Sequence, residues 1–175
     1  MNSDFSTLCD RVDQSSAAAL QNLSQIEASL RELQGEVAKM PFFARGFVSG
    51  EVKKSTGQDL PAWAQALDTL IATIREAQAA TGRVRAAGAV GDADRSVVLQ
   101  AGQRVQAEQP RLGALVAMME KAPTRINAVP SAMLPADRRE ELLGAISRQV
   151  QALNGALAAM PELATSLSAL GGEAA

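Results

Sequence analysis

The fold is decided by residues 4–40, DFSTLCDRVDQSSAAALQNLSQIEASLRELQGEVAKM, where apolar or small side chains recur in alternating steps of four and three. The positions are Phe5, Cys9, Val12, Ser16, Ala19, Leu23, Ile26, Leu30, Leu33, Val37 and Met40. This spacing places them on one face of an α-helix and predicts a seam that packs against another helix at a shallow angle. Such a helix would be roughly 55 Å long, which favours an elongated bundle and a homodimer formed along residues 4–40.

Further stretches with the same helical period complete a predicted all-α, elongated, mostly antiparallel bundle of four long helices. The long helices are expected at about 4–40, 60–87, 93–121 and 135–160, with short helices near 42–55 and 162–170. Prolines set most of these limits, because proline removes a backbone donor and disfavours helical geometry in the residue before it. One kinked helix or two separate helices fit equally well at Pro110. The chain is expected to form one domain, residues 1–175, with a frayed tail at 171–175.

The composition of the 175 residues excludes several kinds of chemistry. There is no histidine, which excludes a histidine-based catalytic triad and a histidine-bound metal. A single cysteine excludes an internal disulfide and a multi-cysteine metal site. The formal net charge of −2 lacks the basic excess that nucleic-acid-binding domains usually carry. We therefore expect no catalytic residue, no metal, no cofactor and no nucleic-acid partner.

Three local patterns suggest chemistry but fit ordinary helices better. Residues 50–55 (GEVKKS) faintly resemble a phosphate-binding loop, yet Lys53 stands where that loop needs a glycine. Asp92 and Asp94 offer too few oxygens for calcium and suit a helix N-cap. Cys9 lies on the seam, where we expect a small buried hydrophobe, with a reactive thiol as the alternative.

Aromatic residues gather in one short region. Four of the five in the chain fall within 22 positions, at Phe42, Phe43, Phe47 and Trp63, and Arg45 lies among them. Aromatic side chains beside arginine are typical of energetic hot spots in protein interfaces. We predict that these five residues bind a partner. As alternatives, the aromatic side chains plug the end of the bundle or lie on a membrane or lipid surface.

These observations predict a non-enzymatic helical interaction protein: an adaptor, a chaperone-like binder or an inhibitor of a protein partner. It would act through an amphipathic helix face and the 41–63 aromatic region. One alternative is an amphipathic protein that coats a membrane or storage granule. Another is an enzyme or ligand sensor with carboxylate and arginine groups in a bundle cavity.

The same sequence supports two further expectations about origin and compartment. The N-terminus has neither a cationic segment nor an apolar segment typical of a signal peptide, so a cytoplasmic location is expected, with signal-less secretion left open. Arginine outnumbers lysine by 13 to 4 and alanine reaches 34 residues, a bias typical of GC-rich bacterial genes.

Overall fold

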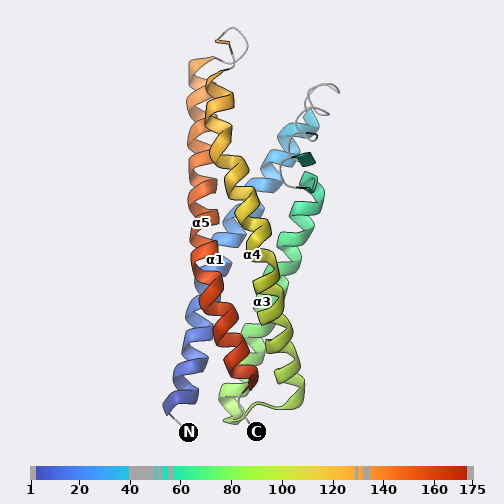
Figure 1. The fold of residues 1–175 in the computed structure, drawn as a ribbon, viewed down its shortest axis with the longest axis vertical. Helices are drawn as coiled ribbons and strands as arrows, with labels where there is room; N and C mark the ends of the chain where they lie inside the picture. The colour runs from blue at the N-terminus through green and yellow to red at the C-terminus, as the bar shows by residue number, and fades with distance from the viewer. Residues whose placement is uncertain are drawn as a thin grey trace.

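The chain forms long helices that run alternately in opposite directions (Figure 1). In the computed structural model, which describes residues 3–39, 50, 53–54, 57–128, 130–131 and 135–172, they are α1 (Ser3–Lys39), α3 (Leu60–Ala87), α4 (Asp92–Asn127) and α5 (Ala136–Gly172). α1 packs against α3 and α5, and α4 packs against the same two helices. The predicted all-α, antiparallel four-helix bundle is confirmed. Both ends of the described chain lie at the same end of the bundle.

α5 continues through Pro161 to Gly172, so the predicted helix end at 160 and the separate short helix at 162–170 are wrong. An internal proline costs a helix about 3 kcal/mol. Burial of a leucine side chain stabilises a fold by about 1.5–3 kcal/mol, and three leucines beyond the proline are buried: Leu163, Leu167 and Leu170. The continuous apolar seam therefore outweighs the proline. Pro161 itself is exposed, so water can satisfy the carbonyl group that the proline leaves without a donor.

α4 also extends beyond its expected end at 121, to Asn127, and contains Pro110 and Pro123 within one continuous helix. Of the two interpretations that were open at Pro110, the single helix is the one observed. Pro110 is exposed, as Pro161 is on α5. The same physical reason applies, because apolar side chains keep their seven-residue spacing on both sides of the proline.

The segment before α3 is described only in part. Of the short helix predicted near 42–55, residues 50, 53 and 54 are described and the rest lies outside the described residues. α3 begins at Leu60 as expected, because Asp59 caps it by accepting a hydrogen bond of 2.9 Å from the backbone N–H of Ala62. It ends where Gly88 adopts φ 71°, a left-handed conformation that favours glycine.

The predicted seam of α1 is buried through most of its length. Its buried apolar members are Phe5, Cys9, Val12, Ala19, Leu23, Ile26 and Leu30. α3 and α5 of the same chain pack against this helix. The hypothesis of a homodimer along residues 4–40 stays a prediction, but as far as Leu30 the seam that suggested it already packs within one chain.

Two neighbouring serines of α1 differ in how their buried hydroxyl groups are satisfied. Ser15 Oγ donates to the carbonyl oxygens of Arg11 at 2.6 Å and Val12 at 3.3 Å. Ser16, the polar residue of the seam, is fully buried, and its Oγ has no hydrogen-bond partner in the described part of the chain. A buried hydroxyl without a partner loses its bonds to water and gains none in return, which destabilises the folded state.

We therefore predict that Ser16→Ala raises the free energy of unfolding by about 1 kcal/mol. Ser15→Ala is the matched control, because it gains the same helix propensity but loses two hydrogen bonds. Urea denaturation followed by circular dichroism measures both variants. A Ser16→Ala variant less stable than wild type would show that the hydroxyl is satisfied in solution.

Candidate interaction surface

The five residues predicted to bind a partner are not brought together in the described part of the chain. Phe42, Phe43, Arg45 and Phe47 lie outside the described residues. Trp63 is 2% exposed and belongs to the hydrophobic core. Its indole is covered by other side chains, so Trp63 offers no surface to a partner here, and the core alternative describes it better.

The core does not extend along the whole bundle. The last buried residue of α4 is Val116, and the first described buried residue of α5 is Ala152. Beyond them, in residues 117–128 and 135–151, none of the described side chains is buried. We name these two stretches the open end. Apolar side chains there are only half-buried: Met118, Met119, Ile126, Leu143, Ile146 and Val150.

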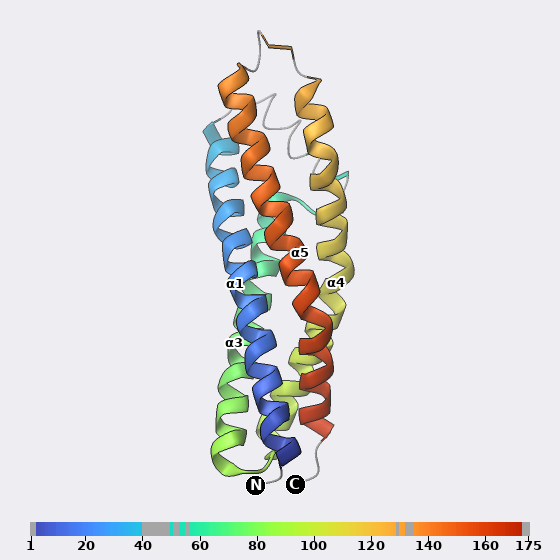
Figure 2. The same ribbon diagram turned by 90° about the vertical axis from the view of Figure 1, so that its left-hand side faces the viewer.

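The short α3 and the divergence of α1, which is as long as α5, explain the open end. α3 contains 28 residues, whereas α4 and α5 contain 36 and 37. At 1.5 Å per residue, α4 and α5 therefore extend roughly 12 Å beyond the part that α3 can cover. Figure 1 shows the α4–α5 pair rising past α3, and the upper ends of α1 and α3 diverging from α4. The view turned by 90° shows the same pair projecting beyond the other helices (Figure 2).

One face of α4 carries cations into the open end. Arg104, Arg111, Met118 and Arg125 follow one another at seven-residue spacing, which is close to two helical turns. We name the following residues of this face the α4 stripe: Arg104, Arg111, Ala114, Met118, Lys121 and Arg125. Its upper part lines a shallow hollow of about 280 Å³ together with Ala117. This hollow combines small and apolar side chains with two cations, Lys121 and Arg125.

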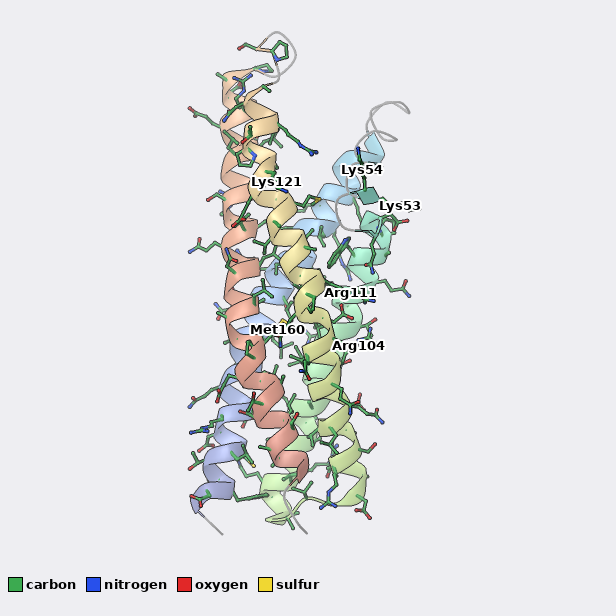
Figure 3. The ribbon with its side chains drawn as sticks, in the orientation of Figure 1. Lys53, Lys54, Arg104, Arg111, Lys121 and Met160 are labelled. Atoms are coloured by element: carbon green, nitrogen blue, oxygen red, sulfur yellow. The ribbon has the colours of Figure 1, made fainter. Side chains whose placement is uncertain are left out.

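The lower part of the α4 stripe faces α3. Arg104 lines a second hollow, of about 250 Å³, whose other residues come from α3 and the turn before it: Gln58, Ala62, Gln65, Ala66 and Thr69. The α3 residues of this hollow carry no charge, whereas a neighbouring hollow of about 230 Å³ brings Arg104 together with Glu76 of α3. In Figure 3, Arg104, Arg111 and Lys121 follow one another along α4, while Lys53 and Lys54 lie near the start of α3. Both of these lysines are exposed.

Glu108 holds two arginines of the stripe in place. Its side chain is 6% exposed, and its Oε1 lies 3.1 Å from Arg111 Nη1 and 3.5 Å from Arg104 Nε. Arg111 Nη1 donates to both carboxylate oxygens. The guanidinium groups themselves stay in water, since the arginine side chains are 53% and 44% exposed. The carboxylate therefore bears most of the desolvation penalty of this cluster.

The other sequence candidates have structural roles. Cys9 is fully buried, and its burial raises the pKa of the thiol. Asp94 pairs with Arg83 at 2.6 Å, which links the start of α4 to α3. Within the described ranges, no three His, Cys, Asp or Glu side chains lie close enough together to hold a metal ion. No described helix has an apolar stretch long enough to cross a membrane.

Sequence reasoning overlooked the α4 stripe. The signal was present, because Arg104, Arg111 and Arg125 keep seven-residue multiples. Regular spacing of cations is common on solvated helix faces, so it could not be distinguished from an ordinary surface. The stripe differs from an ordinary surface because α4 extends beyond α3. This difference in length is informative only once the two helices are known to be neighbours.

The Glu108 cluster predicts an asymmetric response to mutation. Glu108→Leu should keep or raise the free energy of unfolding, by up to about 2 kcal/mol, because the exposed arginines stay hydrated and leucine packs without a desolvation penalty. The double variant Arg104→Ala/Arg111→Ala should lower it by about 3 kcal/mol, because it leaves a buried carboxylate without a partner. Urea denaturation measures both. The interpretation is wrong if Glu108→Leu is the more damaging change.

Cys9 is predicted to be unreactive in the folded protein. Burial excludes reagents and, by raising the pKa of the thiol, shifts thiolate formation to higher pH than in a free cysteine. A thiol-reactive disulfide such as Ellman's reagent should therefore modify the native protein slowly and the denatured protein at once. Fast modification of the native protein, at a rate near that of a free cysteine, would show that the thiol is accessible.

No protein-family model, curated protein or solved structure matches the chain.

Proposed function

We propose that this protein is a non-enzymatic helical interaction protein that binds a protein partner at its open end. The observation that carries the proposal is the half-buried apolar seam of α4 and α5 beyond Val116 and Ala152. Adaptors, chaperone-like binders and inhibitors all act by such contacts, and the proposal includes all three. The aromatic residues Phe42, Phe43 and Phe47 stay a prediction for a second contact.

Burial of the apolar residues of the open end by a partner would stabilise the complex. Each half-buried side chain keeps part of its surface in water, and covering that surface contributes about 25 cal/mol per Å². An apolar centre with a polar and charged rim is the usual composition of protein interfaces. Met118 lines the upper hollow together with Lys121 and Arg125 and matches this composition. Methionine is also suited to variable partners, because its unbranched side chain repacks easily.

The placement of these residues favours a bound segment over a coated surface. Leu142, at 43% exposure, is the one large apolar side chain that is exposed in the described part of the chain. The other large apolar residues of the open end are half-buried. A partner must enter the opening to cover them, which suits a narrow element such as a helix.

Site-specific photo-crosslinking tests this proposal. A photoreactive benzoylphenylalanine at Ala117, which lines the upper hollow, should crosslink a protein in extract of the source cells. The matched control is the same group at Ala72, an exposed alanine of α3 at the level of the closed core. Equal crosslinking at both positions, or none at Ala117, would contradict the proposed function.

A further inference from the structure

We infer that the segment bound at the open end is an acidic, amphipathic helix that lies along the α4 stripe. The inference rests on the proposed function and names the chemistry of the partner. It is carried by two features of α4: the small and apolar side chains of the upper hollow, which we name the floor, and the cations of the α4 stripe, which we name the rim. Each feature selects a different property of the bound segment.

The floor selects an apolar helix face. Ala114 and Ala117 flank Met118 in the upper hollow, and such small side chains let a second helix approach closely. Ile126 and Ile146 continue the apolar surface further along the open end, and both are half-buried. A bound helix that presents apolar residues every three or four positions would complete the seam that α1 and α3 complete lower in the bundle.

The rim selects acidic side chains. Lys121 makes no ion pair with any described residue and is exposed. Arg104 and Arg111 are about half exposed although they hold Glu108, so both can donate hydrogen bonds to a further carboxylate. The exposed acid of this part of α4, Glu120, is the chain neighbour of Lys121, and adjacent residues of a helix point to different sides.

The surfaces beside the α4 stripe carry charges of both signs. The α3 residues of the second hollow are uncharged, but Glu76 of α3 lines a neighbouring hollow with Arg104. Lys53 and Lys54 add two exposed cations near the start of α3. Among the described residues of the open end on α5, exposed acids outnumber exposed cations, with Asp137, Glu140 and Glu141 against Arg148. A partner with carboxylates along one edge of its helix therefore meets opposite charges along the α4 stripe and not along α5.

The length of the α4 stripe fixes the size of the bound segment. From Arg104 to Arg125, the helix rises about 32 Å, which corresponds to roughly six helical turns. The apolar floor distinguishes this segment from a nucleic acid, whose backbone offers phosphates but no apolar face to cover Met118.

Fluorescence anisotropy with synthetic peptides tests the inference on the full chain. The probe is a labelled peptide of about 20 residues, with leucine and alanine at heptad seam positions and glutamate elsewhere. We expect saturable binding that weakens as salt is added, because exposed charges are screened. Lys121→Glu should weaken it about tenfold. Arg75→Glu is the matched control, because it changes the net charge equally at an exposed position of α3 outside both hollows, and it should leave binding nearly unchanged.

Three further probes decide between the chemistries. A peptide with lysine in place of glutamate and a glutamate peptide with serine at its seam positions should both bind weakly. Equal binding of either one, or stronger binding of an oligonucleotide or of anionic lipid vesicles, would overturn the inference. So would an equal loss of binding in Lys121→Glu and Arg75→Glu. Met118→Ser, a half-buried position, should weaken the acidic amphipathic peptide without unfolding the protein.

The outcome at Ala117 separates this inference from the proposed function. If benzoylphenylalanine there crosslinks a cellular protein while the acidic amphipathic peptide does not bind, the protein has a partner at its open end but the acidic chemistry is wrong. If neither crosslinking at Ala117 nor peptide binding is observed, both the proposed function and this inference are wrong. Crosslinking to a peptide rich in acidic residues with helical spacing of its apolar residues, identified by mass spectrometry, would support both.

Discussion

The packing of α4 against α5 is the contact on which the rest of the structure depends. The two helices approach closely where Gly102 faces α5: a Cβ atom added there would lie 3.1 Å from Ser168 Oγ and 3.3 Å from the carbonyl oxygen of Ala164. Gln109 and Pro161 line one hollow between these helices, so Pro110 and Pro161 lie at a similar level of the pair. Pro110 of α4 thus lies at the height of Pro161 of α5, and the seam between the helices continues on both sides.

The shape of the molecule follows from that persistent pair. α4 and α5 continue together past the end of α3, and their apolar seam continues with them. In the lower bundle, four helices bury each seam on two sides. In the open end the same seam has fewer neighbours, so its residues stay half-buried although their spacing has not changed. The difference between core and candidate interaction surface therefore comes from the length of α3 and the divergence of α1 and not from the residue pattern.

Sequence patterns predicted what depends on one helix and missed what depends on two. The seam from Phe5 to Leu30 and the start of α3 at Leu60 are local, and both were predictable. The continuation of α5 beyond Pro161 was not, because the local penalty of proline is visible in sequence whereas the burial that offsets it depends on α1 and α4. Trp63 was assigned to an interface from its neighbours in sequence, but its neighbours in space enclose it.

Glu108 is the point where stability and the proposed binding role diverge. It occupies a seam position of α4 between Val105 and Leu112, where an apolar side chain would pack without desolvating a charge. What the carboxylate provides is the alignment of Arg104 and Arg111, two half-exposed cations at the lower end of the α4 stripe. An isolated arginine on a helix surface samples many rotamers, and fixing it on binding costs entropy. A buried carboxylate that fixes two guanidinium groups beforehand reduces that cost. Local rules of core packing are most often broken where a site needs a particular geometry, and here the exception lies directly below the open end.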